Sequence, residues 1–243
     1  MKQRLLLFIT ALMLCIGAKA ENTTEQVING LRYIIHTDEN YAVVTSNKYN
    51  QPIIVIPTSI TWEGKEYPVT ELGDKCFEGC TNLKSITIPS SVTSIGSYCF
   101  AYCSHLSVIT IPSSVTSLPD NCFLISGLTS ITIPSSVTSL GDWCFSGCSS
   151  LKSIDIPESV TSLGWGCFYN CTGLTSITIP SSVTRLGASC FSDCYSLFSV
   201  DIKSTSITFE GDCFASTAID DFTIMATTPP EITSSCFDKC NIN

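Results

Sequence analysis

The most reactive side chains in this sequence of 243 residues are fifteen cysteines, and most of them recur at a fixed spacing. Six pairs of the form Cys-x-x-x-Cys occur, at 76/80, 99/103, 144/148, 167/171, 190/194 and 236/240. Cys122 and Cys213 repeat the first position of a pair, but Ser126 and Thr217 stand at the second. Cysteines at this spacing could form disulfides, ligate zinc where pairs converge, or pack as small apolar side chains.

The two incomplete pairs argue against chemistry that needs both partners. An obligatory bridge should gain or lose both cysteines together, and a structural zinc site needs four converging ligands. We therefore predict a ladder of buried free thiols and no metal site. Bridges within a unit, and bridges between neighbouring units whose stacked cysteines approach within disulfide range, are the alternatives.

The remaining residues give little indication of a catalytic site. His36 and His105 are the two histidines of the sequence, and a serine nucleophile needs a base within reach together with a group that orients it. No nucleophile elbow, phosphate-binding loop or metalloprotease helix motif occurs. Asp220 and Asp221 are adjacent, so in a strand they point to opposite faces and make a poor acid–base pair. We expect no catalytic residue and no cofactor.

The composition excludes two further classes of protein. The chain has 12 basic and 21 acidic residues, for a net charge of −9, which disfavours binding to nucleic acid. Hydrophobic residues make up 44% and the mean hydropathy is +0.31, which is too apolar for a disordered chain.

The first twenty residues have the features of a secretory signal peptide. Lys2 and Arg4 precede an apolar run over 5–17, and Ala18 and Ala20 supply small residues before a cleavage point. A lipoprotein at Cys15 is disfavoured, because Leu14 stands where a small residue is needed. No later stretch is long and apolar enough for a membrane span. We expect an exported protein, secreted or at the cell surface, with the periplasm as an alternative location.

The elements that must position these residues form an internal repeat. The dipeptide Cys-Phe begins at 76, 99, 122, 144, 167, 190, 213 and 236, at spacings of 22 or 23 residues. In the unit 83–105, alternating apolar residues predict a short strand that Pro89 ends, and Gly96 permits a turn. Cys99, Phe100 and Cys103 lie at the spacing of one helical turn. The sequence therefore predicts an α/β solenoid of about eight units over 53–243, each with a short strand and a short helical or 3₁₀ segment.

The unit L-x-x-I-x-I-P-x-x-V-x-x-I/L-G-x-x-C-F-x-x-C resembles the leucine-rich repeat of the BspA-like family of bacterial surface and secreted proteins. The family commonly has Ala before the Phe, where every unit here has Cys. The resemblance implies a leucine-rich-repeat solenoid and an exported protein that binds host proteins or other cells, which would make it an adhesion module. Fold alone does not fix function.

The segments outside the regular repeat have separate roles. Residues 21–52 are expected to cap the N-terminal end as a β-hairpin, with one strand around Leu31–Ile35 and the other around Tyr41–Val44. An insertion at 58–68 enlarges the first unit, and Gly64 marks its turn. Over 225–243 the repeat becomes irregular, and we recognise no cap or surface anchor there.

Two sets of residues are candidates for binding, and we expect the partner to be a host matrix or cell-surface protein. The first set contains aromatic residues that the repeat does not require: Trp62, Tyr98, Tyr102, Trp143, Trp165, Tyr169, Tyr195 and Phe198. The second set contains outward-facing strand residues: Ser130, Thr132, Ser153, Asp155, Ser176 and Thr178. A glycan-binding module and a structural spacer without its own ligand are the alternatives, and for the aromatic residues so is packing between units.

Overall fold

The first side of each solenoid turn is a short strand, and its inward and outward side chains alternate as the sequence pattern predicts. In β7 (Ser85–Thr87), Ile86 is buried while the flanking Ser85 and Thr87 are exposed. The proline that follows has no N–H to donate, so the strand ends there. The described residues of this computed structural model are 22–46, 48–226, 230 and 235–240, and the expected signal peptide over 1–20 lies outside them.

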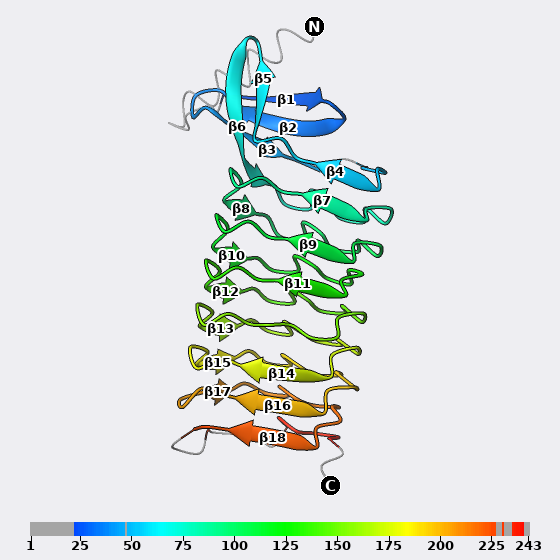
Figure 1. Cartoon of the computed structure of the whole chain (residues 1–243), viewed down its shortest axis with the longest axis vertical. Helices are drawn as coiled ribbons and strands as arrows, with labels where there is room; N and C mark the ends of the chain where they lie inside the picture. Colours follow the sequence, from blue (N-terminus) through cyan, green and yellow to red (C-terminus); the bar gives the residue numbers. More distant parts are fainter. Residues whose placement is uncertain (1–21, 47, 227–229, 231–234, 241–243) are drawn as a thin grey trace, which may run out of the picture.

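Strands on this side lie parallel to one another, in register by whole repeats (Figure 1). Ile131 in one unit lies opposite Ile109 in the unit before it. Asp155 continues the side through an isolated bridge to Thr132. The strands of this first side are β4 (Ile53–Val55), β7, β9 (Val108–Thr110), β11 (Ser130–Thr132), β14 (Ser176–Ile179), β16 (Ser199–Ile202) and β18 (Asp221–Ile224).

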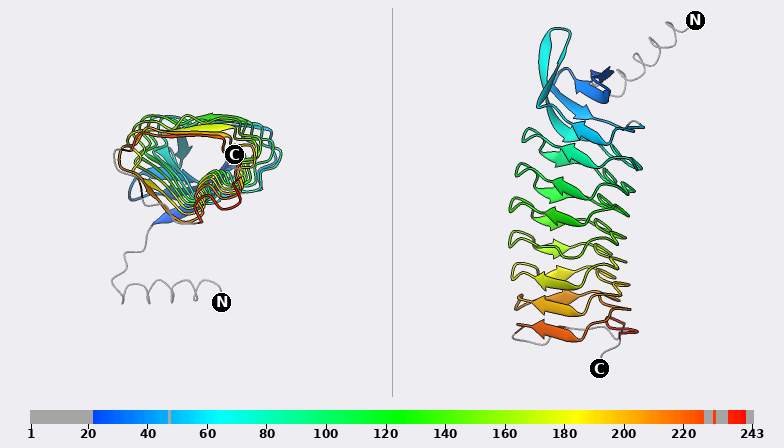
Figure 2. Two further views of the ribbon diagram at one scale, coloured as in Figure 1. Left: turned by 90° about the horizontal axis from the view of Figure 1, so that it is seen from below. Right: turned by 45° about the vertical axis from the view of Figure 1, so that its right-hand side comes forward.

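The second side is a ladder of two-residue strands, in which the last residue of each strand is buried. These strands are β8 (Ser94–Ile95), β10 (Ser117–Leu118), β12 (Ser139–Leu140), β13 (Ser162–Leu163), β15 (Arg185–Leu186) and β17 (Thr208–Phe209). The order β10-β12-β13-β15-β17 is parallel throughout. Viewed along the long axis, the turns superimpose as a closed outline, so each unit covers the next (Figure 2).

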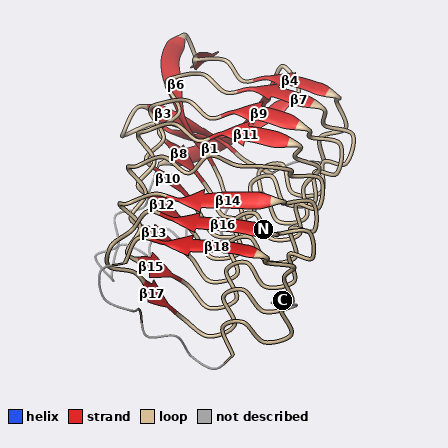
Figure 3. Cartoon of the chain, turned by 60° about the horizontal axis from the view of Figure 1, so that its bottom comes forward, coloured by secondary structure: helices blue, strands red, loops and turns tan. Residues whose placement is uncertain are grey.

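The third side of the solenoid corrects the predicted α/β class. No helix occurs among the described residues, and the Cys-Phe segments are successive tight turns (Figure 3). Tyr98 and Tyr102, four residues apart, have φ angles of 59° and 60°, and left-handed residues at that spacing interrupt a right-handed helix. The N–H groups of Tyr98, Phe100 and Tyr102 donate to carbonyl groups 22 residues further on, in the next unit. Backbone groups that a helix would pair internally therefore join adjacent units instead.

A column of phenylalanine rings runs through the middle of the core. The Phe of each Cys-Phe dipeptide from Phe77 to Phe214 is fully buried. Neighbouring rings have centroids 5.2–5.5 Å apart and planes within 8° of parallel. Phe237 continues the column at 5.5 Å from Phe214. A single unit cannot bury its own ring on both faces, so stacking of units creates the core.

The N-terminal end carries an antiparallel sheet of three strands, one more than the expected hairpin. The residues predicted to pair lie in β2 (Leu31–His36) and β3 (Tyr41–Val44), which pair antiparallel, and β1 (Thr23–Ile28) adds a strand to the outer edge of β2. Strand β3 then pairs in parallel with β6 (Lys65–Leu72), which also pairs with β8. The sheet is therefore joined directly to the second side of the solenoid.

The predicted insertion contains a second hairpin, formed by β5 (Ser59–Trp62) and β6. Glu63 and Gly64 connect the strands with φ angles of 49° and 76°, the left-handed pair that a two-residue hairpin turn requires. Within the described part of the chain, no helix has the length and hydropathy of a membrane span.

Candidate functional site

The fourteen described cysteines are free thiols, and thirteen of them are buried. The second cysteine of a pair has a structural partner: the Sγ atoms of Cys103, Cys148, Cys171 and Cys194 donate to the carbonyl oxygen of the preceding unit's Phe at 3.1–3.2 Å. Where this cysteine is replaced, a hydroxyl takes its place. Thr217 Oγ1 donates to the Phe214 carbonyl at 2.7 Å, and Ser126 Oγ lies 3.3 Å from Cys148 Sγ. Thr217 therefore bonds within its own unit and Ser126 contacts the next one, so the core accommodates a small buried hydroxyl at this position.

Burial also makes these thiols poor nucleophiles. Desolvation raises the pKa of Cys144, Cys167 and Cys190 well above the ordinary value of 9.0. It raises the pKa of Cys148 to about 11, although the Ser126 hydroxyl acts in the opposite direction. A protonated, buried thiol neither attacks a substrate nor binds a metal readily. The described residues contain no cluster of three or more side chains able to hold a metal ion. The cysteines therefore belong to the core.

The strand-face candidates lie where the sequence places them, outward on the first side. Ser130, Thr132, Ser153, Asp155, Ser176 and Thr178 are all exposed. Toward the C-terminal end of this face the polar groups bind one another. Asp201 Oδ2 forms an ion pair with Lys203 Nζ at 2.6 Å, and Asp201 Oδ1 accepts a hydrogen bond from Thr223 Oγ1 at 2.9 Å. Both interactions lower the pKa of the Asp201 carboxyl group.

The aromatic candidates lie mainly on the side of stacked turns, where two columns of left-handed residues run along the solenoid. The column immediately before Cys-Phe includes Tyr98 and Trp143, with φ angles of 59° and 57°, and the other column includes Tyr102 and Asp193. Glycine, Asn and Asp adopt this conformation readily, whereas a bulky residue in it is an outlier. Each unit places a residue in this conformation, and Trp143 has the largest side chain of its column.

Trp143 packs against Trp165 and Tyr169 in an aromatic cluster, to which Tyr195 is joined through Asp193. The Trp143 ring centroid lies 5.9 Å from that of Trp165 and 5.3 Å from that of Tyr169, which it meets edge-on at 70°. Gly166 makes room for the indole: a Cβ atom at this position would lie 2.7 Å from Trp143 Cε3. Trp165 remains 51% exposed and Tyr195 59% exposed, so the cluster presents a hydrophobic surface to solvent.

A carboxylate joins the tyrosines of this cluster. Asp193 interacts with the hydroxyl groups of both Tyr169 and Tyr195, and it raises the pKa of both phenols. For Tyr169 the main cause is the hydrogen bond to Asp193, and for Tyr195 it is the charge of Asp193. The backbone of Trp165 is positioned by a hydrogen bond, in which its N–H donates to Asp142 Oδ1 at 2.7 Å. Asp142, Gly166 and Asp193 were not predicted as site residues, because their roles depend on neighbours about 23 residues away.

The other aromatic candidates lie apart from this cluster. The Lys75 ammonium group is 5.3 Å from the ring centroid of Tyr98, and Tyr102 is 41% exposed in the same unit. Trp62 is half-buried against the core, and its ring centroid is 6.3 Å from that of Tyr67. Phe198 is 50% exposed and directly precedes β16. The structure thus brings together four of the eight aromatic residues named from the sequence.

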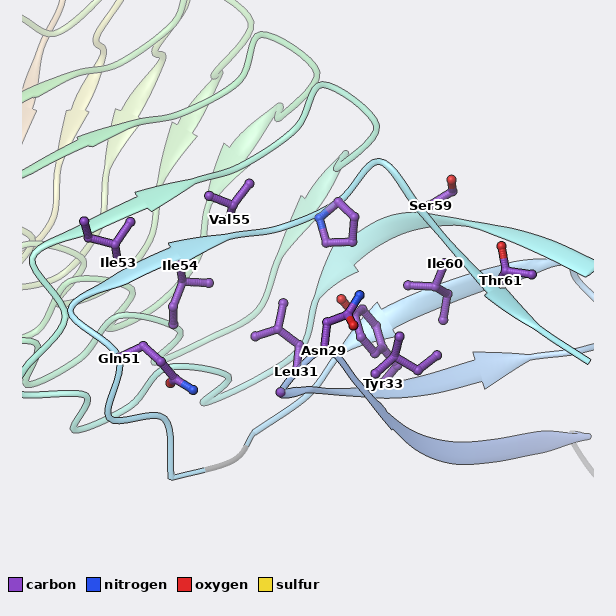
Figure 4. Close-up of a pocket in the computed structure, with 13 residues that line it drawn as sticks. Asn29, Leu31, Tyr33, Gln51, Ile53, Ile54, Val55, Ser59, Ile60 and Thr61 are labelled. Carbon is purple, nitrogen blue, oxygen red and sulfur yellow. The ribbon is translucent and has the colours of Figure 1, made fainter.

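A separate groove lies where the N-terminal sheet meets the solenoid (Figure 4). It has a volume of about 470 Å³ and is lined by the β1–β2 turn, β4 and the start of β5. Its walls are mixed in character, with Tyr33 and Ile54 beside the amides of Asn29 and Gln51. It contains no charged residue and none of the residues named from the sequence as binding candidates.

Two parallel ladders and a side of stacked turns around a continuous apolar core define a leucine-rich-repeat solenoid. Residues 57–133 and 116–243 match the model of the BspA type leucine rich repeat region, in six copies, and the chain belongs to this family. No curated protein sequence matches the chain significantly.

Solved bacterial leucine-rich-repeat proteins share the fold. The chain is 26% identical to one from Bacteroides ovatus, with a TM-score of 0.64 over 80% of this chain and 57% of the other. A leucine-rich-repeat protein from T. pallidum is 27% identical, with a TM-score of 0.69 over 79% of this chain and 89% of the other. A leucine-rich cell surface protein from Faecalibacterium prausnitzii is 30% identical, with a TM-score of 0.58 over 76% of this chain and 56% of the other. The chain thus spans little more than half the length of the Bacteroides and Faecalibacterium proteins.

Proposed function

We propose that the protein is an exported, non-catalytic interaction module that binds a host or cell-surface protein through the side of stacked turns. The observation that carries this proposal is the aromatic cluster of Trp143, Trp165 and Tyr169, in which Trp165 remains 51% exposed. Large, rigid aromatic side chains are enriched at the energetic centres of protein interfaces. The core explains the buried phenylalanines, but it gives no reason for Trp165 and Tyr195 to remain half exposed.

Export is part of this proposal. The signal-peptide pattern of residues 1–20 supports it, as does similarity to a protein described as a leucine-rich cell surface protein. Fractionation of cells that express the full-length chain tests it: the protein should be recovered outside the cytoplasm, about twenty residues shorter at its N-terminus. An intact N-terminus in the cytoplasmic fraction would contradict this part.

Binding itself is tested on the exported form against a panel of purified extracellular-matrix and cell-surface proteins, with a glycan array in parallel. For a protein that binds, changing Trp143 and Trp165 together to Ala should weaken binding by at least about 2 kcal/mol. Changing Thr132 and Thr178 together to Ala, on the strand face, should weaken it less. The opposite order of effects would move the binding site to the strand face.

A double Trp variant that binds normally but unfolds easily would assign these residues to packing, and the proposed site would be wrong. Circular dichroism of each variant separates the two cases, because a change in affinity is meaningful only while the solenoid remains folded. Saturable binding to glycans alone would support the glycan-binding alternative, for which stacking on exposed aromatic rings is also suited.

A further inference from the structure

The aromatic cluster lies among carboxylates that have no basic partner. Asp142 accepts the Trp165 N–H, and Asp193 interacts with Tyr169 and Tyr195. Among the described residues, neither carboxylate forms an ion pair.

The neighbouring basic side chain is already bound elsewhere. Arg185 Nη2 lies 2.7 Å from Glu210 Oε1, and Arg185 Nε donates to the same oxygen at 2.8 Å. Arg185 lies in β15, on the second side of the solenoid, in the same unit as Asp193. Arg185 is therefore not available to neutralise the carboxylates around the cluster.

Elsewhere on the side of stacked turns, a cation of the chain already packs against an aromatic ring. Near the N-terminal end, the Lys75 ammonium group lies 5.3 Å from the ring centroid of Tyr98, one unit away in the same left-handed column. The corresponding position one unit before Trp143 is Asn121, which carries no charge. The indoles of Trp143 and Trp165 have the ring character that attracts a cation most strongly. Within the part of the chain that the structure describes, no lysine or arginine lies over either ring.

We propose that this acidic aromatic site binds a lysine or arginine side chain on a basic segment of the partner protein. The proposal rests on the proposed function and adds the chemistry of the partner. A cation over an indole gains from the ring quadrupole, and the surrounding carboxylates both attract the basic segment and pair with its charge. A neutral glycan would stack on the same rings, but it would leave the carboxylates of Asp142 and Asp193 unpaired. The charge complementarity favours a basic protein segment.

The test uses the exported form of the chain and two synthetic peptides of otherwise neutral sequence. One peptide contains two adjacent lysines, and the other carries the same lysines acetylated at Nζ, which removes the positive charge. Binding is followed by tryptophan fluorescence, because two of the three tryptophans of the chain lie in the site. We expect the charged peptide to bind at least about tenfold more tightly than the acetylated one, and its dissociation constant to rise with salt.

Matched variants locate the binding site. Asp193→Asn and Trp165→Ala should each weaken binding of the charged peptide at least about fivefold, whereas Trp165→Phe should retain part of the affinity. Asp220→Asn makes the same change in net charge at an exposed position at the start of the β18 unit, and Val108→Ala shortens a side chain that is 53% exposed on the strand face. Neither control should change the dissociation constant by as much as twofold.

Three results would overturn the inference: equal binding of the two peptides, equal losses for Asp193→Asn and Asp220→Asn, or no saturable binding up to about 1 mM peptide. None of them refutes the proposed function, which is tested by the effect of the Trp variants on a whole protein partner. Saturation by a neutral maltooligosaccharide that is lost in Trp165→Ala, with no preference for the charged peptide, would assign the site to glycans instead.

Discussion

The buried thiols should make the free energy of unfolding depend on pH. Burial raises the pKa of Cys76, Cys122, Cys144, Cys167, Cys171 and Cys190 well above the ordinary value of 9.0. A thiol whose pKa is higher in the folded chain than in the unfolded chain contributes stability that is fully present below the unfolded pKa. That contribution is lost as the pH rises, because only the unfolded chain can release the proton.

The magnitude follows from the number of such groups. For each thiol that stays protonated in the folded state, the free energy of unfolding falls by about 1.4 kcal/mol per pH unit above the thiol's pKa in the unfolded chain. For the six thiols together this amounts to about 12 kcal/mol at about pH 10.5, which is comparable to the whole free energy of unfolding of a typical domain. We therefore expect cooperative unfolding between about pH 10 and 11, well below the pH at which backbone chemistry intervenes.

The assay is circular dichroism from pH 7 to 11 in the presence of a reductant, with urea titrations at several pH values. The free energy of unfolding should be nearly constant below about pH 8 and should fall increasingly steeply above about pH 9. Cys144→Ser is a suitable single variant, since a serine does not titrate in this range; its curve should be shallower at high pH, although the buried hydroxyl lowers stability at pH 7. A solenoid that remains folded at pH 11 under reducing conditions would refute the argument and indicate that these cysteines do not titrate as buried free thiols.

Three further predictions concern the core, the aromatic site and the redox state. Phe145→Ala should cost about 3–5 kcal/mol in urea unfolding, because it removes a fully buried ring stacked at 5.3 Å on both neighbours, whereas the exposed Thr132→Ala should stay within about 0.5 kcal/mol; equal costs would mean that the inward and outward assignments are wrong. Gly79→Ala should cost about 1 kcal/mol for a left-handed alanine and leave tryptophan emission unchanged, since a Cβ at Gly79 meets nothing within 4 Å. Gly166→Ala should cost more than this, because its Cβ would displace Trp143, and should change the emission; identical emission from the two variants would show that the indole does not pack on Gly166. A thiol reagent should modify few cysteines in the native protein and most of the fourteen described cysteines after denaturation without reductant, and finding only two reactive thiols after denaturation would instead establish six disulfides.

The repeat and its inward-facing residues could be predicted from the sequence because they depend on local rules. Alternation predicted which side chains of β7 and β11 face the core, proline predicted where the strands end, and the spacing of Cys-Phe predicted the stacking. The same local rules failed on the third side. A spacing of i, i+1 and i+4 is compatible with a helical turn, but nothing within one unit reveals that its N–H groups are bonded to the next unit. Left-handed residues such as Tyr98 and Trp143 are also invisible to propensity, because bulky side chains rarely adopt that conformation.

The aromatic site shows the same division between what a sequence contains and what folding adds. Trp143, Trp165, Tyr169 and Tyr195 stand out in the sequence because the repeat does not require them, and this is sufficient to nominate them. Their grouping is a property of the folded chain, since residues about one repeat apart become neighbours only when the turns stack. Gly166 acquires its role from the indole of the preceding unit, and Asp193 from two tyrosine hydroxyls. The periodicity of the chain thus specifies the solenoid and its core. Contacts between successive turns bring the charged and aromatic side chains together, because residues about 23 positions apart in sequence lie only a few ångströms apart once the turns stack.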